Sequence, residues 1–121
     1  MNSTIDRYFA AMGRHDWVEL RGCLSDSFRR VGPWEEHVWD DPDDYIAFLR
    51  ELLPTLKGQK VEVTESVEEG PVVHVNITET IEVEGSPHSV RLASTFRMSP
   101  DNRIEHVEIF ARRLPPARAG G

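Results

Sequence analysis

Strict alternation of apolar and polar residues between Pro71 and Glu84 (PVVHVNITETIEVE) constrains the fold more than any other stretch of this chain. An apolar residue at every second position predicts a β-strand with one buried face and one face exposed to water. The apolar row consists of Val73, Val75, Ile77, Ile81 and Val83. Glu79 interrupts this row, and it would place a carboxylate on the buried face.

Glu79 has two interpretations. A buried carboxylate is costly unless it is paired, hydrogen-bonded or protonated, so Glu79 would mark a polar point in the wall of an apolar cavity. Alternatively, a single β-bulge changes the phase of the strand and turns every later side chain to the other face.

The sequence before this strand predicts three helices and one short strand. Each helix begins at a capping residue followed by apolar residues at helical spacing. The caps are Ser3 or Thr4, then Asp16, then Asp41 with Pro42 behind it. The apolar stripes are Ile5, Tyr8, Phe9 and Met12, then Trp17, Leu20 and Leu24, then Tyr45, Phe48, Leu49, Leu52 and Leu53.

Between the second and third helices, Phe28–Val31 is expected to be a short strand that Gly32 and Pro33 end. The following segment, Trp34–Asp40, has neither helical nor alternating periodicity, and we expect it to be a loop. Its aromatic residues would form a lid over a flat ligand, or would simply pack against the third helix.

Four long strands complete the expected fold. Turn residues separate the alternating segments Lys60–Val67, Pro71–Glu84, His88–Met98 and Ile104–Arg112. Helices grouped on one face of such a sheet make an α+β domain, and a long twisted sheet curls around them. We therefore expect a curved antiparallel sheet wrapped around N-terminal helices, as a cone-shaped barrel with a central pocket. This single domain would span residues 1–113, followed by a flexible tail at 114–121.

Composition excludes several function classes. The formal net charge of -7 disfavours binding to nucleic acid or to an anionic membrane. Cys23 is the only cysteine and no two histidines have ligand spacing on one face, so we expect no disulfide and no metal site. Because we find no leader sequence and no apolar run long enough to span a membrane, a cytoplasmic location is expected.

Several short motifs, taken in their order along the chain, carry a family resemblance. The sequence resembles the SnoaL-like, nuclear transport factor two-like superfamily of cone-shaped α+β domains, from about Thr4 to Arg112. The motifs are Tyr8–Ala11 (YFAA) before Asp16 and Trp17, Leu24–Phe28 (LSDSF), Gly32 with Pro33, Asp43–Leu49 (DDYIAFL) and Asn102–Val107 (NRIEHV). This superfamily includes polyketide cyclases, ketosteroid isomerases, limonene epoxide hydrolases and dehydratases. The resemblance therefore implies a cavity and not a particular reaction.

Alignment with the ketosteroid isomerase pattern implies roles for some residues and shows one gap. Tyr8 falls where that family has an oxyanion-hole tyrosine, and Ser94 falls where it has the second oxyanion acid. Gly32 takes the place of the catalytic aspartate, so that proton shuttle lacks its base. The epoxide hydrolase pattern is also incomplete, because Ile109 replaces one of its aspartates.

The resemblance also implies which strand residues face the cavity and which face pairs two subunits. Both alignments direct Ile77, Glu79, Ile81, Leu92, Ser94, Phe96, Val107 and Ile109 inward. The outward rows would form a mixed polar convex face, which commonly pairs two subunits in this superfamily, so a homodimer is expected. Its residues include His74, Asn76, Arg91, Thr95, Arg97 and His106.

The candidate site follows from these expectations. Glu79 is the proposed proton-transfer group, since burial favours a neutral carboxyl suited to acid/base work, and Tyr8 is its oxyanion partner. We expect Glu79 to lie within reach of Tyr8, Ser94 or His37; the alternative is a structural pairing of Glu79 with an arginine or a tyrosine. The predicted ligand-binding residues are Met12, Trp34, His37, Trp39, Phe48, Leu52, Ile77, Ile81, Leu92, Ser94, Phe96, Val107 and Ile109.

Two functions remain open at this point. The first is an acid/base enzyme without a cofactor, such as a cyclase, isomerase or hydrolase of an apolar small molecule. The second is a non-catalytic ligand-binding or dimerisation module. Inward Glu79 favours the first, and the missing aspartate at Gly32 favours the second.

Overall fold

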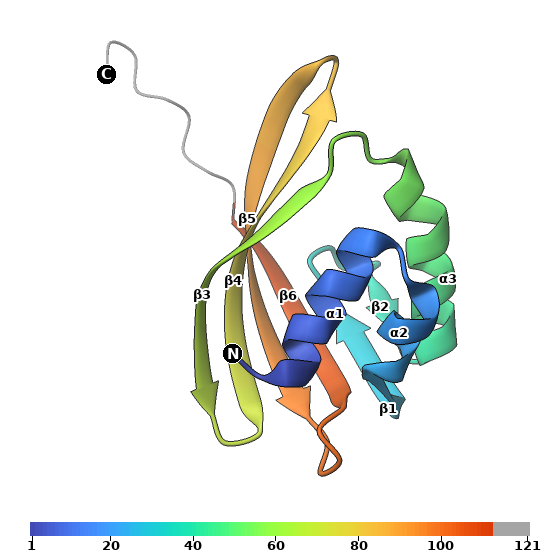
Figure 1. Cartoon of the computed structure of the whole chain (residues 1–121), viewed down its shortest axis with the longest axis vertical. Coiled ribbons are helices and arrows are strands. Elements are labelled where there is room, and N and C mark those ends of the chain that lie inside the picture. The colour runs from blue at the N-terminus through green and yellow to red at the C-terminus, as the bar shows by residue number, and fades with distance from the viewer. Residues whose placement is uncertain (113–121) are drawn as a thin grey trace.

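The computed structural model of the protein describes residues 1–112, so the predicted tail at 114–121 lies outside the described residues. Three α-helices and one short 3-10 helix cover one face of a twisted sheet (Figure 1). The helices are α1 (Ser3–Arg14), α2 (Trp17–Gly22), α3 (Pro42–Leu52) and η1 (Leu53–Thr55). None of the helices within the described range has the length and apolar run needed to cross a bilayer.

The sheet has six strands in the order β2-β1-β6-β5-β4-β3. Its strands are β1 (Leu24–Val31), β2 (Val38–Trp39), β3 (Lys60–Glu69), β4 (Val72–Val83), β5 (Ser86–Met98) and β6 (Ile104–Arg112). The α+β architecture is as expected, but the sheet is mixed, because β1 runs parallel to β6 while the other pairs are antiparallel. It is also open, with β2 and β3 at its edges, and does not close into a barrel.

The start of α1 corrects one expected cap. Asn2, and not Ser3 or Thr4, caps this helix: its side-chain oxygen accepts hydrogen bonds from the backbone N–H groups of Thr4 and Ile5. The Thr4 hydroxyl instead donates to the backbone oxygen of Asn102, 2.6 Å away, and so ties α1 to the β5–β6 turn. The caps predicted at Asp16 and Asp41 are confirmed.

The segment around β1 and β2 also differs from expectation. Strand β1 begins at Leu24 and not at Phe28, so Leu24 belongs to the sheet and not to the inner face of α2. The expected loop at Trp34–Asp40 contains the short strand β2, which pairs antiparallel with the end of β1. Alternation is too short in these two segments to be recognised in the sequence.

Strand β4 has the predicted phase. Val73, Val75 and Ile77 are all buried, and the register between β4 and β5 continues without a bulge from Val72 to Val83. This excludes the alternative in which a bulge turns Glu79 outward. The side chain of Glu79 therefore lies on the face of the sheet that the helices cover.

A bulge that the sequence pattern does not predict lies between β5 and β6. The register of β5 against β6 shifts by one residue between Arg97 and Met98, where Met98 pairs with Ile104. Ile104 has the parity of the outward residue His106, but the shift moves it into the core, where it is fully buried.

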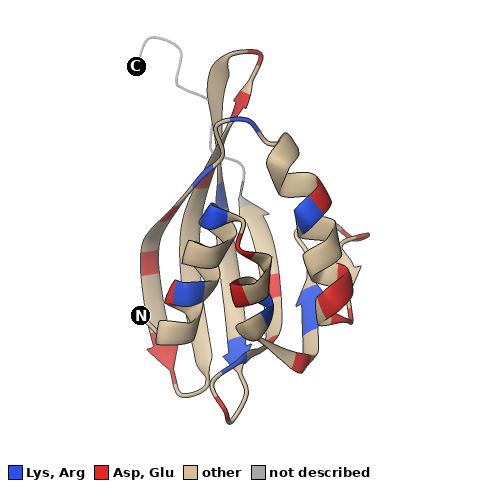
Figure 2. Cartoon of the chain, turned by 45° about the vertical axis from the view of Figure 1, so that its right-hand side comes forward, with Lys and Arg blue, Asp and Glu red and all other residues tan. Residues whose placement is uncertain are grey.

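Charged residues lie mainly outside this core. Figure 2 shows acidic residues along β3 and on α3, and residues of both signs on α1. Fully buried side chains from the helices and the sheet meet between the two layers, among them Ile5, Leu20, Phe28, Tyr45, Phe96 and Val107.

Candidate functional site

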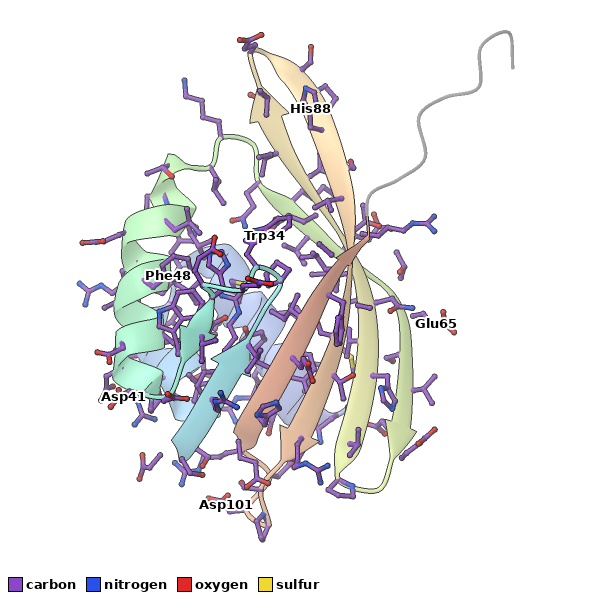
Figure 3. The ribbon with its side chains drawn as sticks, turned by 180° about the vertical axis from the view of Figure 1, so that it is seen from behind. Trp34, Asp41, Phe48, Glu65, His88 and Asp101 are labelled. Atoms are coloured by element: carbon purple, nitrogen blue, oxygen red, sulfur yellow. The ribbon has the colours of Figure 1, made fainter. Side chains whose placement is uncertain are left out.

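A cavity of about 220 Å³ lies between the sheet and helices α1 and α3. Trp34 and Phe48 lie on the helix-covered side of the sheet, whereas Glu65 lies at its outer edge on β3 (Figure 3). The predicted residues that line the cavity are Tyr8, Met12, Trp34, His37, Phe48, Leu52, Ile77, Glu79, Leu92, Ser94, Phe96 and Ile109.

Three of the predicted residues do not line the cavity. Val107 is fully buried in the core beneath it, at the level where β6 pairs with β1. Ile81 lies two residues beyond Glu79 on β4 and does not reach the cavity. The Trp39 ring lies 5.1 Å from the guanidinium carbon of Arg30, and of the three residues expected in a lid only Trp34 and His37 line the cavity.

Glu79 is half-buried and has one side-chain partner. Its Oε2 accepts a hydrogen bond from Nε2 of Gln59 at 3.1 Å. Among the described residues it forms no ion pair, and it makes no hydrogen bond with Tyr8, Ser94 or His37, contrary to expectation.

Strand register explains this separation. Glu79 pairs with Val90, whereas Ser94 lies four residues further along β5. At about 3.3 Å per residue, that is roughly 13 Å along the strand. The ring of Tyr8 lies 5.7 Å from that of Phe96, two residues beyond Ser94, so Glu79 and Tyr8 occupy different ends of the cavity.

Tyr8 and Tyr45 form a buried pair at the end away from Glu79. Their hydroxyl oxygens are 2.6 Å apart, and the two side chains come from α1 and α3. Burial raises the pKa of Tyr8 well above its usual value; the neighbouring Tyr45 raises it further, and the positive charge of Arg30 partly opposes both effects. Tyr8 is therefore a neutral hydrogen-bonding group at physiological pH.

Arg30 is the main site residue that the sequence analysis missed. It lies on β1, two residues after the fully buried Phe28, so it shares the inward face of that strand. Its guanidinium carbon is 5.1 Å from the ring centroid of Trp39 and 5.2 Å from that of Tyr45. Its Nε is buried and has no hydrogen-bond partner within residues 1–112.

A tight turn after β1 positions His37. The backbone N–H of Gly32 donates to the backbone oxygen of His37 at 2.8 Å, and the Gly32–Pro33 peptide bond is cis. The His37 ring lies 5.3 Å from Trp39 and 6.0 Å from Phe48, and its Nδ1 has no partner in the described part of the chain.

Tyr45 and Gln59 were also missed, although the sequence contains a signal for each. Tyr45 belongs to the apolar stripe of α3, and a tyrosine in such a stripe usually brings its hydroxyl to a polar partner. Gln59 has the same parity as the cavity-lining Val61. Within residues 1–112 no cluster of three histidine, cysteine, aspartate or glutamate side chains is placed to hold a metal ion.

The sequence of this chain matches a known family over most of its length. The family model described as a SnoaL-like domain matches residues 5–107. The chain belongs to the SnoaL-like domain family. No curated protein matches it in sequence.

Solved structures with the SnoaL-like or related fold superpose closely on this SnoaL-like chain. A protein of Kribbella flavida DSM 17836, described provisionally as a ketosteroid isomerase, has a TM-score of 0.80 at 18% identity, over 98% of this chain and 82% of its own. An NTF2-like protein of unknown function from Burkholderia pseudomallei has a TM-score of 0.79 at 19% identity, over 90% of this chain and 88% of its own.

An LEH-like epoxide hydrolase of M. tuberculosis has a TM-score of 0.77 at 14% identity, over 92% of this chain and 81% of its own. Identities this low show a shared fold alone. The chemistry of this SnoaL-like domain must therefore be argued from its own cavity.

Proposed function

We propose that the protein binds a small, largely apolar molecule in this cavity and that Glu79 exchanges a proton with it. Most of the residues around the cavity are aliphatic or aromatic, and they include Phe9, Met12, Leu49, Ile77, Leu92 and Phe96. A concave, largely apolar space with a few polar groups is typical of small-molecule sites. The names of structural neighbours, which include an isomerase and an epoxide hydrolase, are compatible with acid/base chemistry.

The proposal depends on the position of Glu79 at the cavity and on its lack of a cationic partner. It is the one carboxylate among the described residues that line the cavity, and no arginine or lysine within residues 1–112 pairs with it. A carboxylate kept for structure would be expected to have such a partner. Its single hydrogen bond from Gln59 orients the group and leaves its other oxygen free of protein partners within the described chain.

An activity screen with a matched pair of variants tests this role. Wild type, Glu79→Gln and Glu82→Gln are assayed on cyclic enones, epoxides and substrates of aldol-type cyclisation. Glu82 lies on the same strand but is exposed and outside the cavity. For any substrate turned over by wild type, Glu79→Gln should lower kcat by at least about a hundredfold, because general acid–base catalysis typically contributes that much. Glu82→Gln should retain wild-type kcat.

Full activity in Glu79→Gln would contradict the proton-transfer role. Loss of activity in both variants would point to a general effect on the fold instead. Circular dichroism and thermal melting of both variants separate the second outcome from a true catalytic effect.

A second candidate is ligand binding without turnover. The distance between Glu79 and the Tyr8–Tyr45 pair favours it, because two groups at opposite ends of a cavity do not act on one small reacting centre. Under this alternative, wild type binds members of the screen but converts none of them.

We also propose a homodimer through the outer face of the sheet, the face that points away from the helices. Phe110 lies on this face, is 55% exposed, and pairs with the exposed Ala93 of β5. An exposed aromatic side chain beside small and polar residues is a suitable centre for a two-fold contact.

A further inference from the structure

We propose that the molecule bound in the cavity carries a carboxylate, and that Arg30 binds this group at the end of the cavity away from Glu79. This inference rests on the proposed ligand-binding function and specifies the chemical class of the ligand. It concerns the groups around Arg30, which the proposed role of Glu79 does not use.

The guanidinium N–H groups of Arg30 have no hydrogen-bond acceptor in the described part of the chain. Its Nε is buried and unpartnered, and the described part of the chain contains no salt bridge and no side-chain hydrogen bond from this guanidinium. A buried donor without a partner destabilises the folded protein, and more so when the group is charged. The two Nη atoms have no described partner either and are not buried, so a bound anion would pair with them and offset the desolvation of this charge.

The contacts of Arg30 hold it for such a role. The rings of Trp39 and Tyr45 lie about 5 Å from its guanidinium carbon, at the distance of a cation–π contact. Ring faces interact with the flat face of a guanidinium, whereas its N–H donors point outward in its plane. The two rings thus hold the cation at the cavity wall, and their faces offer no acceptor that would use up its N–H donors.

A neutral donor lies beside this cation. The Tyr8 and Tyr45 hydroxyls share one hydrogen bond, 2.6 Å long, which uses one of their two protons. The other O–H has no acceptor among the described hydrogen bonds, and it remains available for a ligand oxygen. One positive charge with one neutral donor suits a monoanionic carboxylate better than a dianionic phosphate, which needs more cations.

The register of the sheet sets the direction of the ligand. Arg30 pairs with Val107, which pairs with Phe96, whereas Glu79 pairs with Val90. The two positions on β5, Val90 and Phe96, are six residues apart, which corresponds to roughly 20 Å along the strand. The ligand carboxylate at Arg30 is thereby kept away from the carboxyl group of Glu79, and the apolar body lies over Leu92 and Ile109 between them.

Three ligands of one shape test the proposal on the whole protein by isothermal titration calorimetry at neutral pH. They are 2-naphthoate, its neutral amide 2-naphthamide, and the cation 2-naphthylmethylammonium. Wild type should bind 2-naphthoate at least about tenfold more tightly than 2-naphthamide, as expected for a charge-assisted hydrogen bond in a partly buried site. The cation should show no measurable binding.

Two arginine variants provide the matched comparison. Arg30→Met should bring the affinity for 2-naphthoate down to that for 2-naphthamide, with the affinity for 2-naphthamide itself unchanged. Arg29→Met should behave as wild type, because Arg29 is the next residue on β1, is exposed, and pairs with Asp40 on the other face.

Each remaining outcome has a distinct meaning. Equal affinity of wild type for the acid and the amide, or a preference that survives in Arg30→Met, overturns the role of Arg30 but leaves the cavity as a ligand site. Absence of binding by all three molecules contradicts both this inference and the proposed function. If Arg30→Met fails to fold, the three ligands on wild type alone still decide the sign of the preferred charge.

Discussion

Tyr8 and Tyr45 bury their hydroxyl groups against each other, and this contact makes folding stability depend on alkaline pH. Burial raises the pKa of Tyr8 in the folded protein above the value of 10.0 for a free tyrosine. Folded and unfolded chains are both protonated at this group below that pH, so its contribution is fully present there. Above it, the unfolded chain loses the proton first, and the folded state becomes less stable.

Tyr8→Phe tests this dependence by urea unfolding at a series of pH values. Near neutral pH the variant should be about 1 kcal/mol less stable than wild type, because one hydrogen bond is lost. As the pH rises through about 10, that difference should shrink by up to about 1.4 kcal/mol per pH unit, since only wild type carries this proton. Titrating groups that do not contact Tyr8 are common to both proteins and cancel. A constant difference across this range would show that Tyr8 titrates normally.

The inward position of Glu79 was predictable from neighbouring residues, whereas its partners were not. Alternation along β4 is unbroken, so parity alone assigns Glu79 to the cavity side. The expected contact with Tyr8 fails because parity specifies a face and says nothing about position along the strand. Arg30 was missed for a different reason. Its parity with Phe28 would have placed it on the inward face, but the segment was interpreted only as a short strand before a turn.

At the level of elements, the turn from β1 to β2 depends on Gly32. Its φ of +89° lies in the region that favours glycine, and a Cβ atom there would meet the backbone oxygen of Ile109 at 2.1 Å. The backbone of β6 is held by its own ladder and has little freedom to move aside. The same turn positions His37 at the cavity through the Gly32 hydrogen bond.

Gly32→Ala should therefore be costly in comparison with Gly70→Ala. Gly70 also has a positive φ, of +59°, but a Cβ there would meet nothing within 4 Å. Gly70→Ala isolates the conformational strain, about 1 kcal/mol, while Gly32→Ala adds a backbone clash and should lower the free energy of unfolding by more than about 2 kcal/mol. Urea unfolding measures both values. Equal losses in the two variants would mean that the turn relaxes around the new methyl group.

Connections between elements explain most of what the sequence did not predict about the fold. The four long strands were recognisable because each alternates and ends in turn residues. The parallel pairing of β1 with β6 joins segments far apart in the chain, and no local pattern encodes it. The bulge beside Met98 also has no local signature in the sequence, and without it alternation from His106 would place Ile104 on the outward face.

For the whole molecule, the helices cover one face of the sheet and leave the other uncovered (Figure 1). Outward residues on the middle strands β5 and β6 include Ala93 and Phe110, which pair with each other across the ladder. Burial of a phenylalanine contributes about 1.5–3 kcal/mol, and in a two-fold contact each residue contributes twice.

Phe110→Glu tests the proposed dimer. Wild type should elute with twice the chain mass in size-exclusion chromatography with light scattering. The variant should elute as a monomer at the same concentration, because the substitution removes the aromatic contact and brings two carboxylates together at the symmetry axis.

Val18→Glu is the matched control: Val18 is 85% exposed on α2, in the helical layer, so this variant should remain dimeric. A monomeric wild type, or equal dissociation of both variants, would exclude the outer face as the interface. Unchanged binding of 2-naphthamide by the Phe110→Glu monomer would further show that the cavity forms within one chain, as expected from its lining by α1, α3 and the inner face of the sheet.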